Sequence, residues 1–175
     1  MNEKNQSSSK EKFWTGLPLL IFPIVIYTEL AFFSIQDASG LLNSKITGCI
    51  NIAALVFHIA WSIFLHRRNF SRVHAFFSML SKIVLIPFYI GAFVVGLIAL
   101  LMPMGFLLAL IIAIADAIIF FATSFSQCLA LFGLKKRGTL TTTQFTVFSV
   151  LNWIYCADVV AAFLAWRAEK KSIKE

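Results

Sequence analysis

Five long apolar segments dominate this sequence. A helix that crosses the hydrocarbon core of a membrane needs about 20 mostly apolar residues, and each segment reaches that length. Because lipid cannot satisfy an unpaired backbone, the segments are predicted to be helices rather than an open sheet. The sequence therefore predicts an all-α integral membrane protein, a compact bundle of five transmembrane helices with short loops. The predicted spans are about 13–34, 46–65, 80–102, 106–134 and 144–166.

Composition supports a membrane protein and leaves no room for a separate soluble domain. Hydrophobic residues make up 59% of the 175-residue chain and charged residues 13%, whereas soluble domains carry roughly a quarter charged residues. We expect a polar cytoplasmic tail at 1–12, one helical domain at 13–166 and a basic C-terminal tail at 167–175. The first apolar segment is longer than the core of a typical cleaved signal, so we expect it to be a retained signal-anchor helix.

The positions of lysine and arginine predict the orientation, because cytoplasmic loops carry an excess of these residues. The N-terminal tail and the loops at 66–74 and 135–143 each carry three. Five crossings that start in the cytoplasm place nine of these cations inside and five outside. Four of the five external cations lie in the tail at 167–175, and their position outside does not agree with the excess of cations expected in the cytoplasm. Either this tail is an exception or the fifth segment fails to cross; we favour a crossing, because 144–166 is long enough to span.

Two local patterns mark the boundary between the fourth and fifth segments. Lys135-Lys-Arg-Gly138 places cations at the negative end of a helix dipole and a glycine after it, which predicts a helix end. Thr141-Thr-Thr-Gln144 is a capping-box sequence and predicts the start of the next helix.

Three carboxyl groups fall inside the predicted spans, namely Glu29, Asp116 and Asp158. A charge at the bilayer centre costs about 2.5–3.5 kcal/mol on insertion scales, so these groups should face the bundle interior. Counted along the helices, they lie about 8–15 Å below the outer boundary, and Asn51 lies at a similar depth. We therefore expect one polar pocket in the outer half, with His58 deeper. Two roles are possible for the acids. They form a binding site for a cation or a proton, or they hold the helices together as protonated or paired side chains.

Helical spacing places other residues of these segments on common faces. Asn51, His58 and Ser62 share one face of the second segment, and Asp116, Thr123 and Gln127 share one face of the fourth. Lys82 is a conceivable partner of the acids, but it lies near the inner membrane face and we expect it to extend toward that face. A stripe of small residues on the fourth segment permits close approach of another helix, within the chain or from a partner; it consists of Ala109, Ala113 and Ala117.

These features favour two functions. The acid cluster suggests a small permease or transporter component, and the short chain without a soluble domain suggests a non-catalytic accessory or regulatory subunit of a larger complex. We expect no enzymatic activity, because no HExxH or GxSxG pattern occurs. We also expect no cofactor, no metal site and no nucleic-acid partner. The expected partners are the lipid bilayer and either further copies of the chain or a larger membrane complex.

The length, the short loops and the segment Lys82-Ile-Val-Leu-Ile-Pro-Phe-Tyr89 resemble small membrane proteins of Gram-positive bacteria. The apolar spans predict a multi-pass protein of the plasma membrane, the resemblance implies a bacterial source, and the loop charges predict a cytoplasmic N-terminus.

Overall fold

The structure, a computed structural model, describes residues 13–35, 41–103, 105–155 and 157–172. The predicted polar tail at 1–12 lies outside these residues. The described residues form helices joined by short turns, with no strand among them. The elements are η1 (Leu17–Leu20), α2 (Ile21–Ile35), α3 (Leu41–Arg67), α4 (Ser71–Leu100), α5 (Gly105–Lys136), α6 (Thr142–Leu151) and α7 (Ala157–Ser172).

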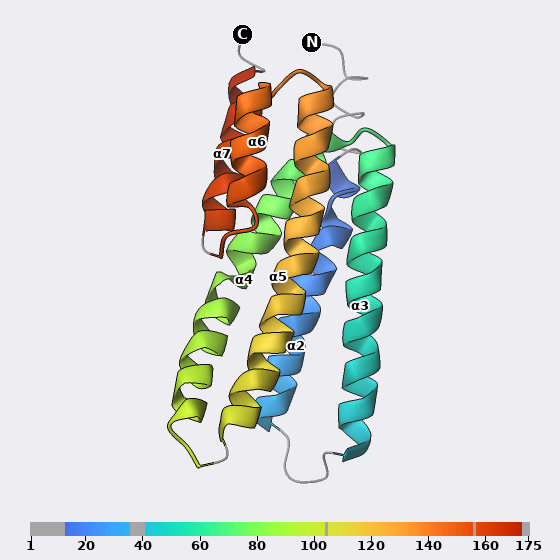
Figure 1. Cartoon of the computed structure of the whole chain (residues 1–175). Helices are drawn as coiled ribbons and strands as arrows, with labels where there is room; N and C mark the ends of the chain where they lie inside the picture. Colours follow the sequence, from blue (N-terminus) through green and yellow to red (C-terminus); the bar gives the residue numbers. More distant parts are fainter. Residues whose placement is uncertain (1–12, 36–40, 104, 156, 173–175) are drawn as a thin grey trace.

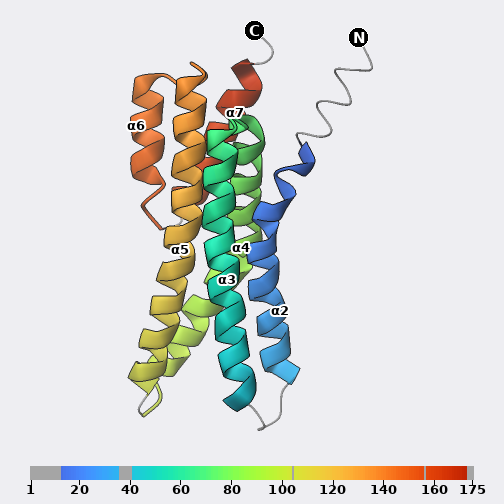
Figure 2. The same cartoon turned by 90° about the vertical axis from the view of Figure 1, so that its right-hand side faces the viewer.

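Helices α2 to α5 run along the long axis of a bundle, and α6 and α7 lie side by side at one end of it (Figures 1 and 2). Among the described residues, three segments are long and apolar enough to cross a membrane, namely Ile46–Arg67, Ser71–Leu100 and Gly105–Lys136. They contain the second and fourth predicted spans and the third as far as Leu100, so the chain has the character of a membrane protein. The first predicted span corresponds to η1 and α2, whose apolar part, Leu17–Glu29, is shorter.

The fifth predicted span is not one helix. Residues 144–166 are divided between α6 and α7, and the chain turns at Asn152–Tyr155 between them. The two helices pack against each other, and α7 returns toward the end of the bundle from which α6 started (Figure 1). The prediction of a continuous fifth helix is therefore wrong, because length and hydropathy alone do not distinguish one long helix from two short ones joined by a turn.

The helix ends at the two basic loops follow from local sequence. Gly138 has φ +73° and ends α5 with a paired hydrogen-bond pattern, Gly138 N to Lys135 O and Thr139 N to Leu134 O, which is the Schellman arrangement. Asn69, with φ +56°, ends α3 in the same way. At the start of α6, Thr141 and Gln144 form the predicted capping box, with both reciprocal hydrogen bonds present.

Helices α4 and α5 form an antiparallel pair with the most extensive contact in the bundle. They approach closely at Gly133, where an added Cβ would lie 2.6 Å from the Cβ of Ser71. Residues of α2, α3, α4 and α5 form an apolar core around Phe22, Leu85 and Ile119. These contacts fix the positions of the polar side chains described below.

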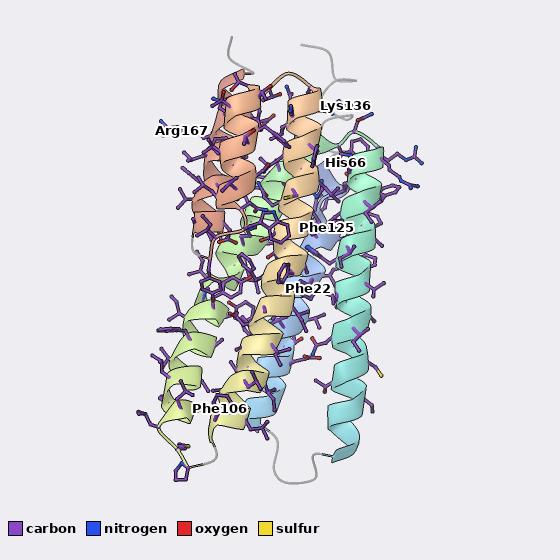
Figure 3. The ribbon with its side chains drawn as sticks, viewed as in Figure 1. Phe22, His66, Phe106, Phe125, Lys136 and Arg167 are labelled. Carbon is purple, nitrogen blue, oxygen red and sulfur yellow. The ribbon has the colours of Figure 1, made fainter. Side chains whose placement is uncertain are left out.

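The outer surface divides into a basic end and an apolar body. Large apolar side chains are exposed along α4 and α5, for example Phe93 and Leu107, as expected for helices that face lipid. Apart from Lys82, the cations whose side chains the structure describes gather at the end where α3 and α5 finish (Figure 3). This basic end carries Arg67, Arg68, Arg72, Lys135, Lys136, Arg137, Arg167 and Lys170.

Candidate binding pocket and buried polar networks

A pocket of about 440 Å³ is lined by residues of α2, α3, α4 and α5, in the half of the bundle away from the basic end. Its lining is mostly apolar and includes two aromatic rings, Phe22 and Phe88. Glu29, Thr47 and Asn51 are its polar side chains. A mostly apolar concavity with a few polar groups is the usual composition of a small-molecule site.

Glu29 and Asn51 form a pair across this pocket. The amide nitrogen of Asn51 donates a hydrogen bond to Oε2 of Glu29. The other carboxylate oxygen, Oε1, is buried and has no hydrogen-bond partner among the described residues. A carboxylate oxygen in apolar surroundings is costly unless a proton, a donor or a cation neutralises it. The pocket therefore contains one acceptor that the described residues leave unsatisfied.

Asp158 belongs to a different network, at the start of α7. Its Oδ2 lies 2.7 Å from Nζ of Lys82, which is fully buried on α4. The same ammonium group donates to Oδ1 of Asn152 at 2.9 Å and to Oγ of Ser124 at 3.3 Å. Three acceptors thus surround the three donors of this buried lysine, as a buried ion pair requires.

The turn between α6 and α7 is held to α5 by the same network. The amide nitrogen of Asn152 donates to the carbonyl of Ser124 at 2.8 Å, and the Ser124 hydroxyl donates to the carbonyl of Asn152 at 3.0 Å. Backbone N–H groups of residues 152–154 also bond to carbonyls of α6. Because these turn groups are paired within the protein, the turn is compatible with a position inside the membrane.

Asp116 occupies a third position. It lies on α5, is half-buried, and has Tyr155 of the α6–α7 turn as its hydrogen-bond partner. The structure therefore does not bring the three acids together. Glu29 and Asn51 share the pocket, Asp158 pairs with Lys82, and Asp116 meets Tyr155. Helical spacing gave the correct faces of single helices, but it carried no information on which helices are neighbours.

His58 and the alanine stripe complete the predicted set. His58 is fully buried on α3, and its ring packs 5.2 Å from that of Phe22, at the edge of the pocket. Ala109 is half-buried, while Ala113 and Ala117 are exposed, so the stripe does not bury itself against another helix of the chain.

Sequence reasoning did not assign Lys82, Ser124 and Asn152 to one buried network. Lys82 was expected to extend toward the membrane face, but it is fully buried and paired with Asp158. A signal was present, because Lys82 and Asp158 are opposite charges within apolar segments. Ser124 and Asn152 gave no comparable signal, since single hydroxyl and amide groups are common in membrane helices.

Comparison with known proteins adds no relative. The sequence matches no family model, and no curated protein and no solved structure is significantly similar to it. Among the described residues, no group of three or more His, Cys, Asp or Glu side chains is placed to hold a metal ion. The pocket and the buried networks are therefore the basis for a functional proposal.

Proposed function

We propose that this chain is a small permease-type protein of the plasma membrane that binds a hydrophobic organic cation at Glu29. The observation that carries the proposal is the Glu29–Asn51 pair in an otherwise largely apolar pocket, with one carboxylate oxygen that bonds to none of the described residues. The proposal also includes a topology of four crossings and one half-depth hairpin.

The topology is supported by charge and by length. The ten residues of α6 extend about 15 Å, half of a hydrocarbon core of about 30 Å. If α6 enters from the basic end and α7 returns there, Arg167 and Lys170 lie on the same side as the loops that follow α3 and α5. The basic tail that contradicted a five-span arrangement then obeys the positive-inside rule. The basic end is the cytoplasmic end in this proposal.

The ligand class follows from the pocket lining. A carboxylate with a free oxygen favours a positive charge, and the surrounding apolar side chains favour a ligand with little water bound to it. Phe22 and Phe88 add ring faces that attract cations. A small hydrated metal ion would lose more hydration than one carboxylate returns, whereas an organic cation with apolar substituents has little hydration to lose.

The proposal is tested by binding of tetraphenylphosphonium, a hydrophobic cation, to the purified protein in lipid nanodiscs. The wild type should bind it saturably, and Glu29→Gln should raise Kd at least about tenfold, since losing one charge pair worth about 1.4 kcal/mol has that effect. Asp116→Asn is the matched control, because it neutralises an intramembrane acid outside the pocket, and it should leave Kd nearly unchanged. Wild-type protein without saturable binding, or equal losses in both variants, would overturn the proposal.

One observation favours the alternative function, a non-catalytic accessory subunit of a larger complex. Ala113 and Ala117 are exposed on α5, and small residues permit close contact between membrane helices. Gentle detergent extraction distinguishes the two functions. A stable partner of fixed stoichiometry favours the accessory subunit, whereas a lone chain that tetraphenylphosphonium stabilises against heat favours the permease.

A further inference from the structure

Three buried side chains from three helices meet at the hydroxyl of Ser126 on α5. The hydroxyl of Ser62, on α3, lies 2.8 Å from it, and Nε2 of His74, on α4, lies 3.1 Å from it. All three side chains are at least 99% buried. The junction lies between the basic end of the bundle and the level of the pocket, because His74 is in the first turn of α4 and Ser62 near the end of α3.

The order of donors and acceptors in this junction can reverse. A hydroxyl donates one hydrogen bond and accepts others, and a neutral imidazole carries its proton on either nitrogen. The Ser62 hydroxyl also lies 2.9 Å from the carbonyl of His58. In one arrangement His74 donates to Ser126, Ser126 to Ser62, and Ser62 to that carbonyl. In the other, Ser62 donates to Ser126 and Ser126 to His74. A series of hydrogen bonds with two such arrangements can transfer a proton from one end to the other.

His58 extends this series of polar groups toward the pocket. It lies one helical turn from Ser62 on the same face of α3, about 6 Å along the helix. The Leu19 carbonyl approaches its ring, but neither ring nitrogen makes a hydrogen bond of good geometry with the described residues. Buried polar atoms of this kind are usually satisfied by internal water. Phe22 is in contact with the other side of the ring and lines the pocket.

The remaining distance lies within reach of water. Asn51 is seven residues before His58, about 10 Å along α3. A pocket of about 440 Å³ has room for several water molecules, each of which occupies about 30 Å³ of liquid. Groups that can pass on a proton are therefore spaced from His74, through Ser126, Ser62 and His58, to Glu29.

From this geometry we infer that the Ser126 junction is part of a proton route between the basic end of the bundle and the Glu29 pocket. A proton that arrives at Nδ1 of His74 releases the Nε2 proton to Ser126, the Ser126 proton passes to Ser62, and the Ser62 proton leaves through water beside His58. One proton enters and one leaves, and no redox change occurs. This inference rests on the proposed function, because the route ends at the Glu29 pocket.

The test is proton flux into proteoliposomes under a potassium diffusion potential, followed with an internal pH-sensitive dye and with no organic cation present. Wild-type vesicles should acidify faster than protein-free vesicles. Ser126→Ala removes the hydroxyl that joins the three helices and should lower the protein-dependent flux at least about tenfold. Ser78→Ala is the matched control, because Ser78 is an equally buried serine on α4 whose hydroxyl bonds to none of the described residues, and it should retain the flux.

The outcomes separate the two proposals. Flux that is no faster than in protein-free vesicles, or equal flux in the Ser126 and Ser78 variants, overturns the proton route even if tetraphenylphosphonium binds as expected. Ser126→Ala should bind tetraphenylphosphonium like the wild type, because Ser126 does not line the pocket. Loss of binding in Glu29→Gln together with loss of flux in Ser126→Ala supports both proposals.

Discussion

The ammonium group of Lys82 on α4 lies 2.7 Å from a carboxylate oxygen of Asp158 on α7, and neither side chain reaches the surface. The two residues are 76 positions apart in the sequence. Removing two charges from water costs several kcal/mol per ion, and close contact with further hydrogen bonds offsets this cost. The pair holds the α6–α7 hairpin against α4, so its integrity should decide whether the hairpin stays docked.

Breaking this pair from one side should destabilise the protein strongly. Lys82→Met leaves the Asp158 carboxylate buried without its cation, and the free energy of unfolding should fall by about 3–5 kcal/mol. Denaturant unfolding in detergent micelles, followed by tryptophan fluorescence, measures the change. The double variant Lys82→Met with Asp158→Leu removes both charges and should recover much of the loss. A double variant with the summed loss of the two single variants would contradict a specific pair.

The half-depth hairpin predicts the side on which the C-terminal segment lies. In a variant that lacks Cys49, Cys128 and Cys156, single cysteines replace Lys170, Arg68 or Met102. All three positions are exposed. A membrane-impermeant thiol reagent added to intact cells should label the cysteine at 102, and should label those at 68 and 170 only after lysis. Labelling at 102 and 170 together in intact cells would restore the fifth crossing.

The close contact of α4 and α5 should be sensitive to one methyl group. In Gly133→Ala the new Cβ would lie 2.6 Å from the Cβ of Ser71, which forces the helices apart. The free energy of unfolding should fall by about 1–3 kcal/mol, the usual cost of overpacking. The matched control is Gly91→Ala, where an added Cβ meets nothing within 4 Å. This control should be neutral or stabilise by up to about 1 kcal/mol, because alanine is the better helix former. Equal destabilisation by both variants would contradict the close contact.

Glu169, beyond the apolar part of α7, should make stability depend on pH. Burial raises the pKa of its carboxyl above the ordinary value of 4.5, while Arg72 and Arg137 act in the opposite direction. The folded state therefore keeps a proton that the unfolded state releases. The stability contribution is complete below pH 4.5 and declines as pH rises through the folded-state pKa.

The variant Glu169→Gln should lack this decline. Unfolding midpoints of the two proteins, measured in steps from pH 4 to pH 8, should therefore diverge on the acidic side of neutrality, with the wild type losing stability relative to the variant. Parallel pH profiles would show that Arg72 and Arg137 cancel the effect of burial.

Much of the local structure was readable from the sequence. The apolar segments around 46–65, 80–102 and 106–134 are helices, because only helices satisfy the backbone over that length of apolar chain. The end of α5 at Gly138 and the capping box at Thr141 also agree with prediction. Of the predicted polar face of α3, His58 and Ser62 are buried and Asn51 is half-buried. Each of these features depends on residues close together in the sequence.

The tertiary structure decided which polar groups meet and whether the last apolar segment is continuous. The 23 residues of 144–166 fit one spanning helix or two short helices equally well by length and hydropathy. The choice depends on Asn152 docking on Ser124 and on Asp158 docking on Lys82. Those partners lie on α4 and α5, so their positions exist only once the bundle has assembled. Long-range contacts also set which helices are neighbours. Glu29 therefore meets Asn51 and not the other two acids.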